Sequence, residues 1–214
     1  NPHLDAEAAI LIPSWDGYAD IWEYLFAGLE TYWPDCPYRV YLGLNEASFP
    51  DPGVNVLRTD RANGFCGGLI DFLSQVPHQW IIIWIDDLLL SERVNTDGLQ
   101  RIIRWGMDNG VGHIRLNQMQ DALVTIAASH FRHLEFDSLG KIPKSSPYRA
   151  GLTVGLWKKS VILHLLRAEE SAWQFERNAG KRSGELKERF YCALSGSSWS
   201  LSVVNAIRKG RWTA

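Results

Sequence analysis

Residues 80–90 decide the fold. They read WIIIWIDDLLL, an unbroken apolar run that ends in two adjacent carboxylates, Asp86 and Asp87. A run of this length, rich in isoleucine, is typical of a strand buried on both faces of a parallel sheet. Open α/β sheets bind their ligands at the carboxyl ends of such strands. Because an isolated buried charge costs several kcal/mol, paired acids there indicate a cation, a hydrogen-bonding ligand or open solvent. The alternative is that Asp86 caps a turn while Asp87 is solvated.

Strands and helices alternate at short spacing through the first half of the chain. The helix after the turn at 14–17 has one continuous apolar face as far as residue 33. This βαβα order predicts an α/β fold with a mostly parallel sheet, right-handed crossovers and helices on both faces. The predicted strands are 8–13, 38–44, 54–57, the apolar run from residue 80 that ends in Asp86-Asp87, and 113–116, and the further predicted helices are 67–76 and 99–107.

The pattern after Gln120 is less regular. Residues 122–128 fit either a strand or a helix, and residues 131–136 alternate weakly. Residues 141–148 contain two prolines and predict a loop, and residues 156–167 predict an amphipathic helix. The polar, glycine- and serine-rich stretch 180–196 predicts a mobile segment.

Length and composition predict one domain over residues 1–214, with ample material for a core at 46% hydrophobic residues. The net charge of −2 and the scattered basic residues argue against nucleic acid as a partner. Three cysteines without CxxC or zinc spacing indicate free thiols in a reducing compartment, so we expect a cytoplasmic protein. No stretch approaches the roughly 20 apolar residues of a membrane span, and no signal peptide is visible. Since the chain begins at Asn1 rather than Met, we expect a domain excised from a longer protein.

Several common chemistries lack their motifs. There is no GxGxxG fingerprint, since residues 64–68 (GFCGG) have the wrong spacing, and there is no phosphate-binding GxxxxGK[ST] loop. HExxH and GxSxG are absent too, and His130 and His133 have no third ligand beside them. These observations argue against a dehydrogenase, a P-loop kinase, a zinc hydrolase and a serine esterase.

The remaining pattern resembles the nucleotide-binding half of a GT-A glycosyltransferase. A first strand ends in Pro13-Ser14, a second strand ends near Asn45, and a helix then leads into the strand that ends in Asp86-Asp87. The chain is more similar still to a bacterial subfamily found in capsule and other surface-polysaccharide loci. The stretches that carry this similarity, in order along nearly the whole chain, are 32–38, 86–90, 142–149, 155–159, 170–176 and 205–212.

The resemblance implies that the two halves of the chain bind different substrates. Residues 1–117 would bind a nucleotide-sugar donor, and residues 118–214 would bind a glycan or glycolipid acceptor. It also allows peripheral association with the inner face of the membrane or with other polysaccharide-assembly proteins.

The acidic pair is expected to serve a divalent cation. Transfer from a nucleotide sugar expels a diphosphate, and Mn²⁺ or Mg²⁺ bound to carboxylate oxygens would stabilise that leaving group. Asp87 is the first choice as metal ligand, and Asp86 could hold ribose, sugar hydroxyls or a metal-bound water. The first acid of a strict DxD motif is replaced by Ile85, so the sequence leaves metal dependence open.

Donor-binding candidates follow the first three strands. Pro13, Ser14 and Asp16 occupy the place where this fold receives base and ribose, although Asp16 is an equally good helix cap. Asn45 is a weaker candidate for the same role.

The segment with Arg61, Asn63, Gly64 and Phe65 precedes a helix, whose N-terminal amides favour diphosphate or sugar oxygens. The alternative is that this segment is an ordinary turn.

Glu176 is the candidate general base, because inverting members carry an acid on a helix after the acceptor segment. Glu170 is its rival, and a surface charge is the alternative for Glu176. Trp173 could stack on a sugar or lie in the core. Tyr148 and Arg149 are acceptor-side candidates, and Arg149 could pair with phosphate or with Glu176.

Two other functions remain as alternatives. A nucleotidyltransferase would need a glycine- and arginine- or lysine-rich phosphate loop after the first strand, which residues 13–16 (PSWD) do not provide. A non-catalytic glycan- or nucleotide-binding module would release no nucleoside diphosphate.

Overall fold

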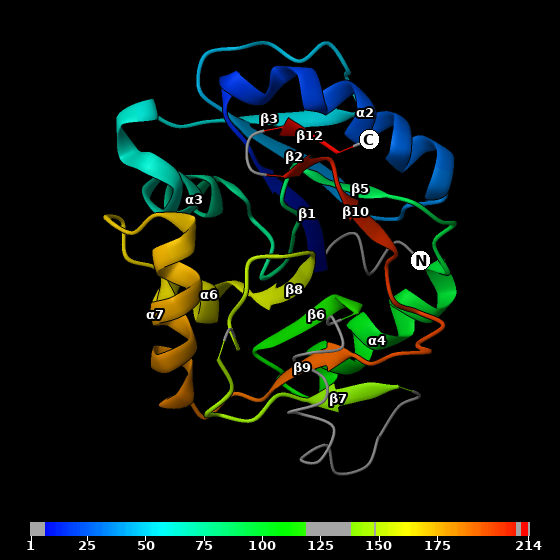
Figure 1. Cartoon of the computed structure of the whole chain (residues 1–214), viewed down its shortest axis with the longest axis vertical. Coiled ribbons are helices and arrows are strands. Elements are labelled where there is room, and N and C mark those ends of the chain that lie inside the picture. Colours follow the sequence, from blue (N-terminus) through cyan, green and yellow to red (C-terminus); the bar gives the residue numbers. More distant parts are fainter. Residues whose placement is uncertain (1–6, 119–137, 148, 209–210, 214) are drawn as a thin grey trace.

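A computed structural model of the chain describes residues 7–118, 138–147, 149–208 and 211–213 (Figure 1). Its centre is an eight-stranded sheet in the order β3-β2-β1-β4-β8-β6-β9-β7. Six of these strands run in one direction, while β8 and β7 run in the other. The bounds are β1 Ala8–Pro13, β2 Arg39–Leu44, β3 Val54–Arg58, β4 Trp80–Ile83, β6 His113–Gln118, β7 Leu139–Lys141, β8 Gly155–Lys158 and β9 Phe190–Ala193.

The central strands are buried on both faces, as their unbroken apolar runs predict. Every residue of β1 and β4 is buried. Successive side chains point to opposite faces, so Ile10 and Ile82 enter one core while Leu11 and Ile83 enter the other. The two cores are the two interfaces between sheet and helices.

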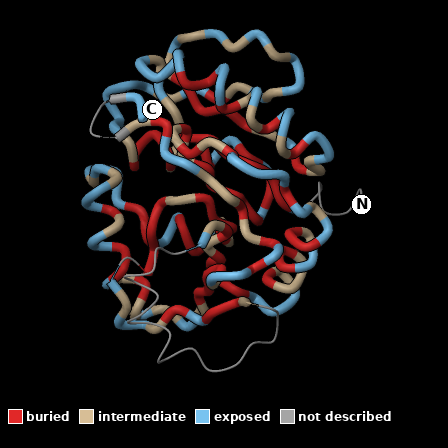
Figure 2. Tube along the Cα trace, turned by 45° about the vertical axis from the view of Figure 1, so that its right-hand side comes forward, coloured by how far each residue is buried: buried red, intermediate tan, exposed pale blue. Residues whose placement is uncertain are grey.

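Helices cover both faces of the sheet. Helices α2 and α4 bury residues in the core that holds Ile10, whereas α3, α6 and α7 bury residues in the core that holds Leu11. In Figure 1, α3, α6 and α7 gather on the left. Figure 2 shows the buried strands at the centre and exposed helix surfaces around them. The helical bounds are η1 Asp16–Tyr18, α2 Ala19–Tyr32, η2 Arg61–Asn63, α3 Gly64–Gln75, α4 Thr96–Asp108, α6 Lys159–Leu165 and α7 Ala172–Gly184.

The strand that was predicted to end in Asp86-Asp87 is shorter in the structure. Strand β4 ends at Ile83, Asp86 and Asp87 lie in a turn, and β5 (Leu88–Leu90) begins a separate small sheet. Ile81, Ile82 and Ile83 are fully buried, whereas Ile85 in the connection is only half-buried. The partner of β5 is β10 (Val203–Asn205), and β11 (Ile207–Arg208) pairs with β12 (Arg211–Trp212).

Two predictions for the second half were wrong. The expected helix at 156–167 begins only at Lys159, because the residues before it form β8 between β4 and β6. Gly155 is required in that strand, since a Cβ there would lie 2.5 Å from His113 Cε1. The stretch 180–196 is not a mobile tail, since α7 continues to Gly184 and the buried strand β9 follows. Residues 122–128 and 131–136 lie outside the described residues.

No helix in the described part of the chain is long and apolar enough to cross a membrane.

Candidate functional site

The acidic pair lies at the carboxyl edge of the sheet, where β1, β2 and β4 end side by side. Ser14 follows β1, Asn45 follows β2, and Asp86 and Asp87 follow β4 after two connecting residues. The backbone joins these ends, because Ser14 N–H donates to the Gly43 carbonyl at 3.0 Å. Ser14, Asn45 and the two acids therefore lie at one edge of the sheet.

Asp86 is buried and held by a short hydrogen-bond chain. The Ser14 hydroxyl donates to Asp86 Oδ2, and Trp22 Nε1 donates to Ser14 Oγ at 2.8 Å. Asp86 is only 4% exposed. Burial raises the pKa of Asp86 to about 6 and the neighbouring Asp87 charge adds to the shift, while the Ser14 hydrogen bond opposes it. Asp86 is thus a poorly solvated carboxylate that accepts from the Ser14 hydroxyl and from the backbone of the acidic turn.

Asp87 lies beside it with its carboxylate free of side-chain partners among the described residues. The acids are the two central residues of a turn closed by Leu88 N–H and the Ile85 carbonyl at 3.1 Å. Partial burial raises the pKa of Asp87. Its own backbone N–H opposes that rise, and a half-buried carboxylate that no described side chain engages is available to a ligand.

These two residues fit a divalent cation that is shared with a substrate. Their oxygens are the hard ligands that Mg²⁺ and Mn²⁺ prefer. No group of three or more His, Cys, Asp or Glu side chains suited to a metal occurs in the described part of the chain. One or two carboxylates completed by phosphate oxygens and water is the usual arrangement for Mg²⁺.

Asp16 does not cap the helix that it precedes. Its carboxylate accepts from the backbone N–H groups of Asn45, Glu46 and Ala47 at 2.8–3.0 Å, across the sheet edge. Desolvation raises its pKa, but these three bonds and the Arg58 charge outweigh it, so the pKa of Asp16 is lowered. The helix-cap alternative is corrected: Asp16 fixes the loop after β2 to the loop after β1.

Asn45 lies in that fixed loop. Its Nδ2 donates to the Thr59 carbonyl at 3.2 Å, and its own carbonyl accepts from the Arg58 guanidinium at 3.1 Å. The loops after β1, β2 and β3 are therefore connected by side-chain hydrogen bonds, and together they border the acidic turn.

Residues 61–65 form the entry to α3. Gly64 is the first residue of the helix and has φ of +64°, a conformation that favours glycine. The Asn63 side chain is already hydrogen-bonded within the protein, because its Nδ2 donates to Asp71 Oδ2 at 2.6 Å. Arg61 lies over the Trp15 ring at 5.0 Å, and Phe65 packs at the margin of the core. The backbone amides at Gly64 and Phe65 open the helix, as the diphosphate hypothesis requires.

Glu176 lies on α7 and reaches the segment before β8. Its Oε1 accepts from the Leu152 N–H at 2.8 Å. Burial raises the pKa of Glu176, and the Leu152 hydrogen bond and the nearby Arg115 charge oppose that rise. Because β8 runs antiparallel to β4, the segment before β8 lies at the same sheet edge as the acidic turn. A carboxylate with a raised pKa at that edge suits a general base.

Glu170 is fully engaged in packing. The Arg182 guanidinium donates two hydrogen bonds to its carboxylate, at 2.6 and 2.8 Å, and Asn178 donates a third at 2.7 Å. Those bonds, the Arg182 bonds first, lower the pKa of Glu170 against an opposing effect of burial. A carboxylate held in this way is a weak base, so the geometry favours Glu176.

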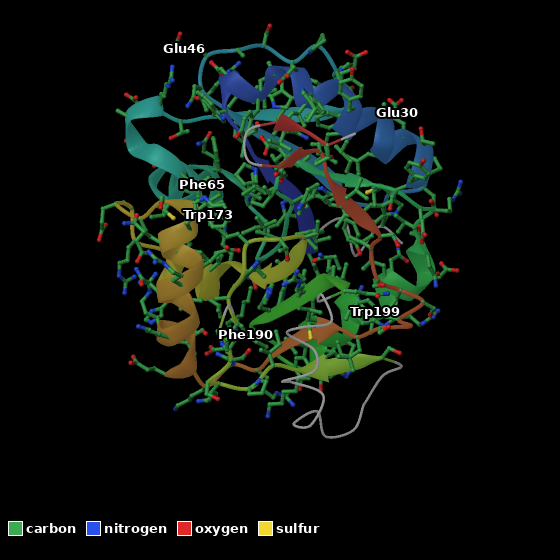
Figure 3. All side chains as sticks on the ribbon, viewed as in Figure 1. Glu30, Glu46, Phe65, Trp173, Phe190 and Trp199 are labelled. Carbon is green, nitrogen blue, oxygen red and sulfur yellow. The ribbon has the colours of Figure 1, made fainter. Side chains whose placement is uncertain are left out.

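The acceptor-side candidates differ in position. Trp173 is 78% exposed on the first turn of α7, so the alternative that it lies in the core is wrong. Figure 3 shows it beside the end of α3 that carries Phe65.

Arg149 is 2% exposed and does not pair with Glu176. It donates to the carbonyls of Ser183 and Glu188 and stacks on the ring of Phe190 at 4.0 Å, and burial lowers its pKa to about 10. Tyr148 lies outside the described residues.

Two residues of the site were not singled out from the sequence. Trp22 was assigned only to an apolar helix face, although an indole N–H that is buried needs an acceptor. Arg115 lies between the buried residues Ile114 and Leu116 of β6, and a charged residue at such a position is a signal of a partner. Its Nε donates to Asn117 Oδ1 at 3.3 Å, and its charge faces Glu176.

No family model and no curated protein sequence matches the chain. Solved structures do match it in three dimensions. S. aureus TarS 1–349 in complex with UDP-GlcNAc is 10% identical, with a TM-score of 0.62 over 96% of this chain and 60% of that one. The mannosyltransferase PcManGT from Pyrobaculum calidifontis, in complex with GDP-Man and Mn²⁺, is 13% identical, with a TM-score of 0.61 over 98% and 60%.

The fold is GT-A-like. The similarity includes the second half of the chain, since 96–98% of the chain is covered. The chain spans about three-fifths of the length of these solved structures. At these identities the likeness shows the GT-A-like sheet and its helices, while the chemistry has to be argued from the residues of this chain.

Proposed function

We propose that this chain is a glycosyltransferase domain that moves a sugar from a nucleotide-sugar donor to a glycan acceptor. The observation that carries the proposal is the placement of Asp86 and Asp87 at the carboxyl edge of a GT-A-like sheet. Solved neighbours of this fold are complexes with UDP-GlcNAc and with GDP-Man and Mn²⁺, which supports a nucleotide sugar as the donor class.

Asp87 is the proposed metal ligand and Asp86 its partner. A bound Mn²⁺ or Mg²⁺ would supply Lewis-acid stabilisation to the departing diphosphate. Asp87 is partly exposed and has no side-chain donor to displace, whereas Asp86 already accepts from Ser14. Asp86 is therefore better placed to orient ribose, a sugar hydroxyl or a metal-bound water.

The donor base and ribose are proposed to lie against the fixed loops after β1 and β2. Asp16 holds the backbone at 45–47, so this part of the site is shaped before a ligand arrives. Such preorganisation lowers the conformational cost of binding. The amides at Gly64 and Phe65 are the proposed contacts for diphosphate or sugar oxygens.

Glu176 is the proposed base that takes the proton from the acceptor hydroxyl. Its carboxylate is oriented by the Leu152 N–H and keeps a raised pKa, which makes it a stronger base than an ordinary glutamate. Direct attack of the activated hydroxyl on the anomeric carbon inverts the configuration. Exposed Trp173 on the same helix offers a ring face for a sugar of the acceptor. A role in surface-polysaccharide synthesis follows from the sequence resemblance.

Nucleotide binding tests this proposal directly. UDP and GDP are titrated into the wild-type chain by calorimetry, with and without Mn²⁺. We expect Mn²⁺-dependent binding that Asp87→Ala abolishes, while exposed Asp35→Ala, the matched control, leaves it unchanged. Release of nucleoside diphosphate from a nucleotide sugar then distinguishes an enzyme from a binding module. Full Mn²⁺-dependent binding by Asp87→Ala would remove the basis of the proposal.

A further inference from the structure

The last stretch of the sequence resemblance, residues 205–212, has no role in the function proposed above. In the structure its described residues belong to a strap, which we define as residues 201–208 and 211–213. The strap starts beside β6, where Leu201 N–H donates to the Leu116 carbonyl at 2.8 Å. It then pairs antiparallel with β5 through β10, and Figure 1 shows β10 lying next to β5. The strap thus connects the strand that carries Arg115 to the strand that follows the acidic turn.

The strap contacts the acidic turn at one backbone group. The turn satisfies its own outer groups, since Leu88 N–H closes it onto the Ile85 carbonyl. The carbonyl of Asp87 remains, and it accepts from the N–H of Ala206 at 2.6 Å. Ala206 is only 5% exposed, so water does not readily replace this donor. Within the described ranges no side chain holds the Asp87 carboxylate, and its hydrogen bond comes from its own backbone, so its position depends on that backbone.

The outer end of the strap is itself anchored. Thr213 N–H donates to the Ala206 carbonyl at 2.8 Å. The next residue inward, Trp212, packs edge-to-face on Tyr24 of α2 with ring centroids 5.3 Å apart. Ala206 is therefore held from both sides, by β10 before it and by the Thr213 contact after it. These contacts keep its N–H aimed at Asp87.

We propose that the C-terminal strap is a positioning element of the metal site, in which the Ala206 N–H fixes the backbone of Asp87 and so presents its carboxylate to the cation and diphosphate. This inference rests on the proposed function of Asp87. Ala206 touches neither cation nor substrate and acts only through Asp87.

The decisive variant is Ala206→Pro, which removes the N–H and keeps a small side chain. The preceding Asn205 is in an extended strand, the conformation that a following proline favours. Ala206→Ser keeps the N–H and is the matched control. Thr213→Pro removes the outer anchor and serves if Ala206→Pro does not fold.

Two measurements distinguish the positioning effect of the Ala206 hydrogen bond on Asp87 from an effect on the overall stability of the protein. Hydrogen exchange of the ligand-free protein should be faster in Ala206→Pro at residues 86–88 and unchanged in Ala206→Ser. Calorimetry with UDP or GDP plus Mn²⁺ should show a Kd about tenfold higher for Ala206→Pro, the range expected from loss of one buried hydrogen bond. Thr213→Pro should move both readouts in the same direction by less.

The outcomes distinguish the strap from the proposed function when Asp87→Ala is measured in parallel. If Asp87→Ala loses binding while Ala206→Pro keeps the wild-type Kd, the proposed function stands and the strap inference is overturned. A fall in Tm for Ala206→Pro without a change in Kd would overturn it as well. If Asp87→Ala binds like the wild type, the metal role and this inference fall together.

Discussion

Asp86 lies where a charge is unfavourable, and this has a measurable consequence. The carboxyl is buried, its one side-chain donor is Ser14, and a second acid follows it in the chain. Each unit of pKa shift corresponds to about 1.4 kcal/mol of difference between the two protonation states. The folded chain therefore favours protonated Asp86 over a range of pH in which the unfolded chain is already ionised.

We expect Asp86→Asn to stabilise the protein above pH 6. The folded pKa of about 6 exceeds the ordinary 3.8, so the destabilisation is absent below about pH 4 and complete above about pH 6. Asparagine keeps an oxygen for Ser14 and removes the charge, so the gain at pH 8 should be about 3 kcal/mol. Urea unfolding at pH 4, 6 and 8 measures it. A difference between variant and wild type that does not change with pH would contradict this account. Divalent-dependent binding should weaken in the same variant.

Glu176→Gln should lower kcat by about 10²–10⁴-fold, the usual contribution of a general base. Glutamine can still accept from the Leu152 N–H, so Tm should change little. The raised pKa places the acidic limb of the kcat profile above the ordinary range of glutamate, and this limb should vanish in the variant. A variant with wild-type kcat would show that Glu176 is not the base.

Glu170→Gln is the matched control on the same segment, with the opposite expectation. It breaks the bidentate pair with Arg182, so we expect a loss of about 1–2 kcal/mol in the free energy of unfolding. The kcat of the folded fraction should stay near the wild-type value. If instead Glu170→Gln lost activity without losing stability, Glu170 would be the base.

At the scale of elements, the loops after β1, β2 and β3 act as one unit because polar side chains cross between them. Asp16 binds three consecutive backbone N–H groups of the loop after β2, and Arg58 binds the same loop from β3. The loop packs on the core only from Ala47 and Phe49 onward, whereas Asn45 and Glu46 are held by these polar contacts. The geometry at the start of the loop is therefore sensitive to the Asp16 carboxylate.

Asp16→Ala should loosen residues 45–47 without unfolding the domain. Three donors lose their acceptor at a largely solvated place, so we expect a loss of about 1 kcal/mol, comparable to loss of a helix cap. The lowered pKa means that the stabilisation is present above pH 3.8 and is lost as pH falls through the folded pKa. Hydrogen exchange at 45–47 measures the loosening, and calorimetry with UDP or GDP should show weaker binding. Unchanged exchange would contradict the role of Asp16 in holding the loop.

At the scale of the whole molecule, stability depends on a sheet covered on both faces. Ile83→Asp should prevent folding, because Ile83 is fully buried and an unpaired charge there has no compensating partner. Leu163→Asp, on an exposed position of α6, is the control and should fold. Far-UV circular dichroism and gel filtration of both variants make the test. A folded Ile83→Asp would show that this face of β4 is accessible to water.

The sequence by itself determined the first half of the sheet. Apolar runs bounded by prolines and polar turns are local features, and they identify β1, β2, β3 and β4 closely. The acidic pair was predicted at the right edge for the same reason, since a polar residue directly after a buried strand must lie at its end. The shared edge follows because parallel strands end together.

Tertiary structure alone decided the second half and the partners within the site. Residues 156–158 belong to a strand rather than a helix because β4 and β6 provide hydrogen bonds on both sides. Glu170 and Glu176 look alike in sequence, and only the packing of α7 gives one to Arg182 and the other to Leu152. Asp16 and Ala206 likewise bind groups more than 25 residues away in the chain. Such pairings depend on which surfaces meet after folding, and periodicity along the chain carries no information about them.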